Sequence, residues 1–220
     1  PANTLSLHDA LPISVSPMIA SGRVLKALNK DCKVVFVGPC IAKKAEAKEK
    51  DLVGDIDYVL TFHELRDIFE ALDINPSTLT GVPSMEYASK GGRLYARTGG
   101  VSKAVSDALE DMYPEKHKLL NPIQANGVKE CKVVLEQVKN GTLKANFIEG
   151  MGCVGGCVGG PKALIPKEDG KRFVDDFATA STIKVATHSE IMDDILGRIN
   201  ITSRKDFTDE KKIEIFERHF

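Results

Sequence analysis

The chain has 220 residues, 42% of them hydrophobic and 28% charged, which is enough to bury the core of one globular unit or slightly more. Its thirty basic and thirty-one acidic residues exclude nucleic acid and anionic membranes as partners selected by charge alone. The sequence has neither the roughly 20 consecutive apolar residues of a membrane span nor a secretory leader pattern, so we expect a soluble, cytoplasmic protein.

The first residues of the chain differ in character from the rest. Thr4 to Ile13 spell TLSLHDALPI, which back-translates to a common sequencing-library adapter. We therefore expect residues 1–14 to be an artefact joined to a truncated reading frame. Residues 15–200 are expected to form the functional domain, and residues 201–220 a helical extension.

The first half of the chain alternates between helix and strand patterns. Apolar periodicity predicts a helix over residues 18–29 and a short strand over 33–37. A second strand over 57–62 passes into a helix over 63–72, and frequent Gly, Pro and Ser predict a loop over 76–92. The residues expected to face inward from the first helix are Ile19, Val24, Leu25 and Leu28.

The alternation continues in the middle of the chain. A regular apolar stripe predicts a helix over 101–112, followed by a strand over 119–125 and a second amphipathic helix over 128–138. A short strand over 145–148 leads into a glycine-rich run. This order predicts an α/β fold with parallel strands.

Weaker patterns follow residue 166. The sequence predicts a charged turn over 167–170 and a weak strand over 182–186. Thr187 and Glu190 suggest a capping box for a helix over 189–199, and a last helix is expected to start at Thr208.

The five cysteines, an odd number without regular spacing, favour metal or redox chemistry over disulfides. Cys131 shares the apolar stripe of its helix, and Cys32 lies on the same strand face as Val34, so both are interpreted as core residues. Cys40 follows the first strand at its carboxyl end, where α/β sheets place ligands, and is interpreted as a functional thiol.

The strongest signal is the run from Glu149 to Pro161, which contains Cys153 and Cys157 among six glycines. A spacing of four residues would place both sulfurs on one side of a helical turn. Glycines would let a bulky inorganic group approach, and their N–H groups could bind anionic sulfides. The run therefore predicts an iron–sulfur site. A glycine turn with incidental thiols, a zinc site and a phosphate loop are weaker alternatives.

Three segments, in this order, resemble the C-terminal domain of the large subunit of the [FeFe], or iron-only, hydrogenases. Gly38-Pro39-Cys40-Ile41-Ala42-Lys43-Lys44-Ala45-Glu46 is similar to the family's Met-Pro-Cys-x-x-Lys-x-x-Glu, with Gly38 in place of methionine. Thr98-Gly99-Gly100-Val101 matches a second motif, and Glu149, Met151, Cys153 and Cys157 match Glu-x-Met-x-Cys-x-x-x-Cys. The resemblance covers Val15 to about Pro166 and implies an α/β fold with parallel or mixed sheets flanked by helices.

The resemblance implies a cofactor called the H-cluster, a [4Fe-4S] cubane joined to a two-iron subcluster with CO, cyanide and a bridging dithiolate. By matched position, Cys40 and Cys153 would hold the cubane, and Cys157 would hold it and bridge to the two-iron centre. Lys43 would hydrogen-bond a cyanide, and Met151 would pack against the two-iron centre as an apolar wall.

A cubane takes four cysteines, and these motifs supply three. The family's fourth comes from a Thr-Ser-Cys-Cys-Pro segment that would lie just before Val15, so we expect the chain as given to be inactive. The family's active enzymes usually continue Cys-x-x-Gly-Gly-Gly-Gln-Pro, whereas Cys157 is followed by Val158-Gly159-Gly160-Pro161-Lys162. In these residues after Cys157 the chain resembles the sensory branch of the family.

The resemblance implies either reversible H2 oxidation and proton reduction or hydrogen sensing in an anaerobic cell. The implied partners are H2 or protons and a ferredoxin-like electron donor or a signalling protein. The alternative is a cubane-only iron–sulfur scaffold or assembly protein related to the family.

Overall fold

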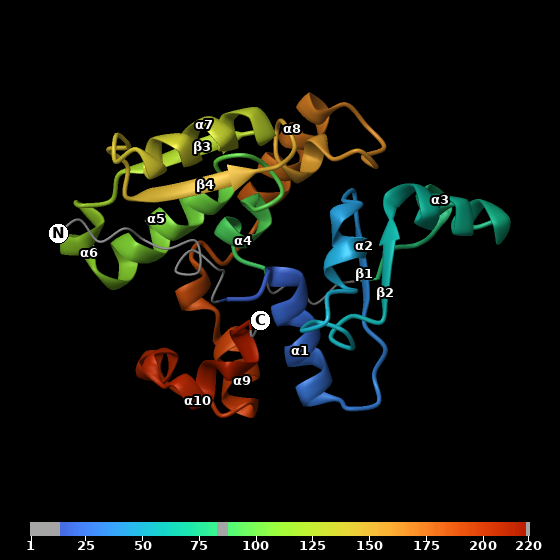
Figure 1. Cartoon of the computed structure of the whole chain (residues 1–220). Coiled ribbons are helices and arrows are strands. Elements are labelled where there is room, and N and C mark those ends of the chain that lie inside the picture. Colours follow the sequence, from blue (N-terminus) through green and yellow to red (C-terminus); the bar gives the residue numbers. More distant parts are fainter. Residues whose placement is uncertain (1–13, 83–87, 219–220) are drawn as a thin grey trace. The chain divides into compact units, whose positions relative to one another are not determined.

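In a computed structural model of the chain, residues 14–82 and 88–218 are described (Figure 1). The segment interpreted as an artefact lies outside the described residues except for Ser14. The chain divides into two compact units. The first contains residues 1–37, 42–60 and 193–220, and the second contains residues 38–41 and 61–192.

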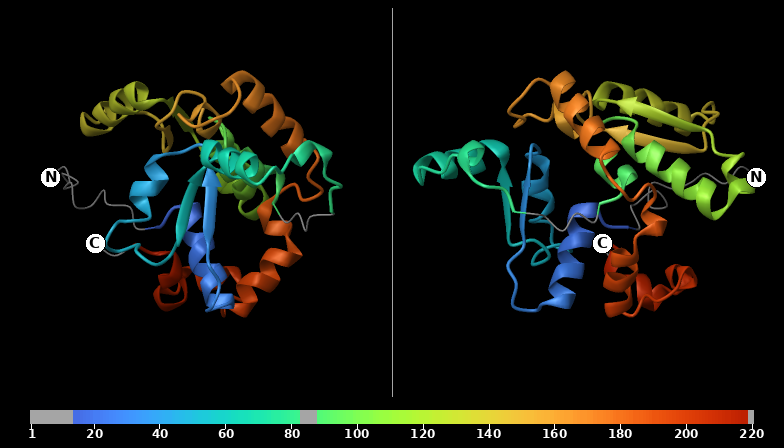
Figure 2. Two further views of the ribbon diagram at one scale, coloured as in Figure 1. Left: turned by 90° about the vertical axis from the view of Figure 1, so that its right-hand side faces the viewer. Right: turned by 180° about the vertical axis from the view of Figure 1, so that it is seen from behind.

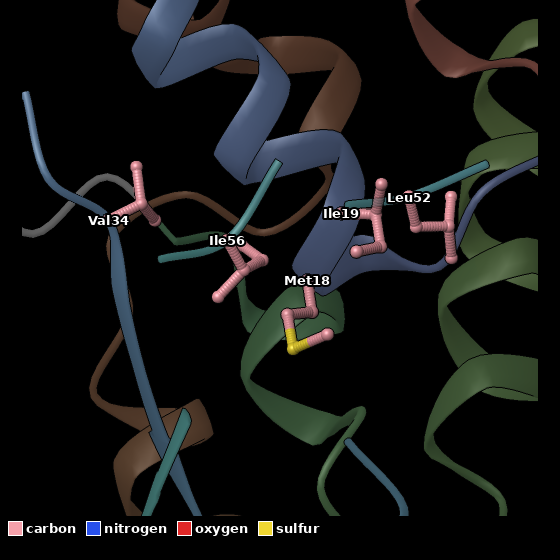
Figure 3. Packing of buried hydrophobic residues seen from close by; sticks show 5 residues of the cluster. All are labelled: Met18, Ile19, Val34, Leu52 and Ile56. Atoms are coloured by element: carbon pink, nitrogen blue, oxygen red, sulfur yellow. The ribbon is translucent and has the colours of Figure 1, made fainter. Parts of the chain in front are cut away.

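The core of the first unit lies beside helix α1 (Pro17–Leu28), which confirms the first predicted helix. Five buried side chains form this core: Met18, Ile19, Val34, Leu52 and Ile56 (Figure 3). Cys32 and Phe36 are partly buried against it, in agreement with the interpretation of Cys32 as a core residue.

The prediction that Leu25 faces inward is wrong, because this side chain is 50% exposed. The buried residues of α1 are Met18, Ile19 and Gly22. A Cβ atom at Gly22 would lie 2.5 Å from the Asp55 carbonyl oxygen, so the residues around Asp55 pack directly on the helix backbone at this point. The inward face is therefore set by this close approach rather than by the apolar stripe alone.

The first unit also contains most of a short two-stranded sheet of β1 (Val35–Gly38) and β2 (Tyr58–Thr61). Along the chain, β1 is followed by α2 (Ala42–Glu46) of the first unit, and β2 by α3 (Phe62–Ala71) of the second unit. Asp57 fastens the sheet: its carboxylate accepts a hydrogen bond from Val34 N (2.8 Å) and lies 2.7 Å from Lys26 Nζ. Both strands were predicted, although the exposed Val35 and Tyr58 show that neither is fully buried.

The C-terminal residues join the N-terminal ones within this unit. They form η5 (Arg204–Thr208), α10 (Glu210–Ile213) and η6 (Glu214–Phe216). Val15 N donates to the Phe216 carbonyl (2.8 Å), and Arg218 Nε lies 2.7 Å from Asp51. The last predicted helix therefore exists but begins at Glu210, with the Asp209 carboxylate capping it by accepting from Lys211 N.

The second unit is built on two parallel strands, β3 (Pro122–Asn126) and β4 (Phe147–Met151), whose register runs from Pro122 opposite Phe147 to Asn126 opposite Met151. Helices α5 (Gly100–Met112) and α7 (Val128–Lys139) contact the pair and lie to either side of it (Figures 1 and 2). This arrangement confirms the predicted α/β fold with parallel strands.

The second unit also contains further short and long helical elements. They are η2 (Pro76–Thr78), α4 (Lys90–Leu94), α6 (Pro114–His117), η3 (Cys157–Gly159), α8 (Lys167–Thr179) and η4 (Ala186–His188), and α9 (Glu190–Arg198) runs on into the first unit. Within the predicted loop, Ser89 starts α4 by accepting from Gly92 N (3.1 Å). No described helix is long and apolar enough to cross a membrane.

Three predictions for the last third are wrong. Residues 167–170 are the first turn of the thirteen-residue α8 rather than a charged turn, since Gly170 packs on Val158 instead of breaking the helix. Residues 182–186 form no strand. Thr187 does not cap α9, because its hydroxyl donates to Asp111 (2.6 Å), and Ser189 Oγ accepts from Met192 N instead.

Candidate iron–sulfur site

All five cysteines lie within the described residues, and none forms a disulfide. Cys131 Sγ is directed at the ends of the two parallel strands, 3.7 Å from the Ala125 carbonyl oxygen and 3.6 Å from that of Met151. This thiol packs against the backbone but is only partly buried, and Val134 is the buried residue of its helix, so Cys131 is less buried than the core position that was predicted.

Cys153 and Cys157 lie on the loop that follows β4, but they do not share a helical turn. Gly156 N donates to the Cys153 carbonyl (3.0 Å), which closes a tight turn between the two cysteines. Gly155 and Gly156 have φ values of +94° and +85°, outside the right-handed helical region. The prediction of one helical turn is therefore wrong: the thiols flank a glycine turn, and η3 begins only at Cys157.

Three of the six glycines in this run, Gly156, Gly159 and Gly160, admit protein backbone rather than an inorganic group. A Cβ atom would lie 2.6 Å from Thr98 N at Gly156 and 2.8 Å from the Pro39 carbonyl oxygen at Gly160. At Gly152, by contrast, a Cβ atom would meet no atom within 4 Å. Open space for a bound group is thus found beside Gly152, between Met151 and Cys153.

The N–H groups of the run are largely committed to protein acceptors. Gly155 N donates to Asn126 Oδ1 (2.7 Å), and the Gly156, Gly159 and Gly160 N–H groups donate to carbonyls within the loop itself. The prediction that these glycines offer their N–H groups to sulfides is wrong for these four, because they hold the loop in its own conformation.

Cys40 is brought to the same region by its neighbour. It follows the end of β1 by two residues, and the Pro39 carbonyl accepts a hydrogen bond from Lys162 N (3.1 Å), five residues beyond Cys157. Together with the close approach of Gly160 to Pro39, this bond joins the Cys40 loop to the Cys153–Cys157 loop. Within the described residues, however, no three His, Cys, Asp or Glu side chains are grouped closely enough to hold a metal ion.

A cavity of about 520 Å³ opens beside Cys157. Its wall is almost wholly apolar and consists of Pro39, Phe62, Ala96, Cys157, Val158, Ala163, Leu164, Ile165, Gly170, Phe173 and Val174. The Cys157 thiol is the reactive group on this wall, and it is exposed.

The other two predicted site residues have these positions. Met151 is the last residue of β4 and is partly buried. Lys43 lies on α2 in the first unit, where its ammonium donates to Glu46 Oε2 (2.6 Å) and Ser16 Oγ (3.0 Å).

An ion pair fixes the segment just before Thr98 to α8. Arg97 Nε lies 2.5 Å from Asp175, which Lys171 also contacts at 2.6 Å. The hydrogen bond from Lys171, assisted by Arg97, lowers the pKa of the Asp175 carboxyl from its ordinary value, although partial burial opposes this shift. Asp175 is therefore ionised at neutral pH and holds the two cations together.

Two functional candidates have no predicted role: Glu149, which is buried in β4, and Asn126, at the end of β3. The signal available in the sequence was a carboxylate, Glu149, directly after the strand predicted over residues 145–148. An ionisable group in a buried strand needs hydrogen-bond partners, and only the folded chain identifies them.

The parallel strand pair between helices, with the backbone of the Cys40 loop bonded to the loop that carries Cys153 and Cys157, defines the class of the protein as an α/β domain with a cysteine–glycine loop after a strand. The family model described as "Iron only hydrogenase large subunit, C-terminal domain" matches residues 4–161, and the chain belongs to this family.

Two curated relatives are similar in sequence. Iron hydrogenase 1 of Clostridium pasteurianum is 31% identical over 172 residues, covering 63% of this chain and 30% of the relative. The periplasmic [Fe] hydrogenase large subunit of Nitratidesulfovibrio vulgaris is 27% identical over 190 residues, covering 70% of this chain and 45% of the relative. The chain therefore spans less than half the length of either relative.

Solved structures show the same fold. An [FeFe]-hydrogenase studied for oxygen damage to the 2Fe subcluster of its H cluster has a TM-score of 0.69 at 19% identity, covering 94% of this chain and 68% of the other. A variant of the [FeFe]-hydrogenase HydA1 from Chlamydomonas reinhardtii has a TM-score of 0.66 at 18% identity, covering 95% and 70%.

Homologous [FeFe]-hydrogenases carry an H-cluster of a [4Fe-4S] cubane and a two-iron subcluster. The donors of this chain fit that group in part. Cys40, Cys153 and Cys157 are thiols on two joined loops, with open space at Gly152 and a cavity at Cys157. A cubane takes four cysteines, and the chain's matched motifs contain three.

Proposed function

We propose that this chain is an H-cluster domain that binds a cubane through Cys40, Cys153 and Cys157, with Cys157 also bridging to a two-iron subcluster. The observation that carries the proposal is the bond from Lys162 N to the Pro39 carbonyl, because it joins the loops of the family's two cysteine motifs. Residues 15–200 would form this domain, with residues 201–220 as an extension.

When bound, the group supplies reversible conversion of H2 into two protons and two electrons. The chain's part is to hold the group and shape its surroundings. The apolar cavity beside Cys157 suits a small uncharged molecule such as H2 better than a charged one, since it offers almost no polar partner. Met151, a soft and partly buried side chain, would form an apolar wall next to the open space at Gly152.

Lys43 is proposed to donate a hydrogen bond to a cyanide ligand. Its ammonium has three N–H donors, and Glu46 and Ser16 take two of them, which leaves one and orients the group. The side chain is 25% exposed, so its positive charge would be only partly screened and could offset an anionic cyanide.

We propose a hydrogen-sensing role for this member in preference to bulk turnover. Support comes from the sequence, where Gly38 replaces the family's methionine and Val158-Gly159-Gly160-Pro161-Lys162 follows Cys157. Small residues around a cofactor alter its polarity and the access of gas. A signalling protein or a ferredoxin-like donor in the cytoplasm of an anaerobe would then be the partner.

The thiol assignments can be tested by anaerobic reconstitution with iron and sulfide. Cys40→Ser, Cys153→Ser and Cys157→Ser should each lower the iron bound per chain, whereas Cys131→Ser should not, because a hydroxyl can replace its weak S–H donor. Equal iron in Cys153→Ser and the parent chain would exclude the proposal. With three thiolates from the chain, one cubane iron needs a donor from elsewhere, so we expect no hydrogen turnover from the chain alone.

Infrared spectroscopy after maturation would separate the proposed domain from a cubane-only scaffold. An H-cluster shows CO and cyanide bands, and a cubane alone shows neither. Voltammetry of the matured protein then addresses the sensing role, since high sustained currents would contradict it.

A further inference from the structure

Glu149 is a buried carboxylate that caps a distant helix. It lies in the middle of β4 and is 3% exposed, and its two oxygens accept hydrogen bonds from Gly99 N (2.8 Å) and Ser102 N (2.7 Å). These N–H groups belong to the N-terminus of α5, where the helix dipole also favours a negative charge. Gly99, the N-cap residue, has no side chain for this purpose, so Glu149 replaces the missing cap from fifty residues along the chain.

Asn126 makes a second connection to the same segment. Its Oδ1 accepts hydrogen bonds from Thr98 Oγ1 (2.9 Å) and from Gly155 N (2.7 Å). Thr98 N also donates directly to the Gly155 carbonyl (3.1 Å). Thr98 and Gly155 are thus tied together twice, and Gly155 lies between the two cysteines of the loop.

These two side chains come from the parallel strand pair. Asn126 ends β3, and Glu149 lies on β4 four residues before Cys153. The segment Thr98–Ser102 is therefore fastened at one point to the strand that delivers the cysteine loop and at another to the loop itself. Removing Glu149 would leave the buried Ser102 N–H and the partly buried Gly99 N–H without this acceptor. Removing Asn126 would do the same to the partly buried Gly155 N–H and Thr98 hydroxyl. Either loss is destabilising at that location.

We propose that Glu149 and Asn126 are positioning residues that lock the Cys153–Cys157 loop against the start of α5 and thereby set the direction of its two thiols. They act through the backbone of the loop, and no contact of either side chain with a cysteine sulfur is required. Whether these residues lock the loop can be tested without a cluster, whereas the effect of the lock on a bound cluster rests on the proposed function.

A matched control is offered by Ser102. Its hydroxyl is buried and has no hydrogen-bond partner among the described residues, while its backbone N–H binds Glu149. Ser102→Ala therefore changes a buried side chain at the same place without removing either acceptor. A general effect of mutating this region would appear in this variant as well.

The experiment has a first arm without any cluster. Amide hydrogen exchange of the full chain should become at least about tenfold faster over residues 152–160 in Glu149→Ala and Asn126→Ala, because each loses a side chain that accepts two hydrogen bonds. Glu149→Gln should show a smaller increase, since its single amide oxygen keeps one of the two bonds. Ser102→Ala should match the parent chain. Unchanged exchange in both alanine variants, or an equal increase over the whole chain, would overturn the proposal.

The second arm follows anaerobic reconstitution with iron and sulfide. The electron paramagnetic resonance spectrum and the reduction potential of the bound cluster should shift in Glu149→Ala and return toward the parent values in Glu149→Gln. Identical spectra in all variants would refute the effect on the thiols. If the parent chain binds no cluster at all, the proposed function fails, and the exchange measurements still decide whether the lock exists.

Discussion

Replacement of Gly156 by alanine is expected to damage the cysteine loop both through its backbone conformation and through its close neighbours. Its φ and ψ of 85° and −155° lie in a region that is essentially restricted to glycine. A Cβ atom there would also lie 2.6 Å from Thr98 N and 2.8 Å from the carbonyl carbon of Arg97. These neighbours are backbone atoms, so they cannot rotate away as a flexible side chain would.

The two effects add because they are different in kind. A residue held in this backbone region costs about 1 to 3 kcal/mol, and forcing an extra methyl group into a packed site costs about 1 to 3 kcal/mol. Gly156→Ala should therefore lower the free energy of unfolding of the second unit by about 2 to 6 kcal/mol, a large part of a typical domain's stability of about 5 to 15 kcal/mol.

Hydrogen exchange at increasing urea concentrations, read on peptides from α5 and β4, gives the stability of this unit. With a urea slope of about 2 kcal/mol per molar, the middle of the usual range, the midpoint should fall by about 1 to 3 M. Gly152→Ala is the control, because its Cβ atom would meet nothing within 4 Å, and its stability should stay within about 0.5 kcal/mol of the parent. Equal midpoints for the two variants would refute the reasoning.

Three further predictions concern the rest of the chain. Hydrogen bonds from Lys26 and a backbone N–H lower the pKa of Asp57 well below its ordinary value of about 3.9, so the stability that Asp57 contributes is fully present above that pH and is lost as the pH falls below it. In acid titrations followed by circular dichroism, Asp57→Asn should therefore lose less stability than the parent chain. Identical acid profiles for the two proteins would contradict this prediction. In urea unfolding, Ile19→Ala should cost about 2 to 5 kcal/mol and Leu25→Ala much less, because Ile19 is fully buried and Leu25 is half-exposed. Asp175→Asn, which breaks two partly exposed ion pairs, should cost under about 1 kcal/mol and lose its effect in about 1 M salt, whereas a salt-independent loss would indicate a packing role.

The sequence was informative where a pattern is local. Helices α1, α5 and α7 follow from apolar periodicity, and the parallel strands β3 and β4 follow from the order of elements. The cysteine motifs could also be located, because thiols and glycines at a given spacing can be recognised from the sequence alone. Helix α8 was not predicted, because Gly170 is unfavourable inside a helix and its packing against Val158 cannot be seen in the sequence.

By itself, the sequence determined which motifs the chain shares with its family and hence which residues we propose for an iron–sulfur group: Cys40, Cys153 and Cys157. Only the tertiary structure decided what the glycines beside them are for, because Gly156 and Gly160 are required by backbone from Thr98 and Pro39, far away in the chain. It likewise decided the role of Glu149, since a buried carboxylate is stable only beside donors, and its donors lie at the start of α5. A motif along the chain indicates which residue types are candidates for a site, whereas the contacts that orient their loop are made between segments distant in the sequence.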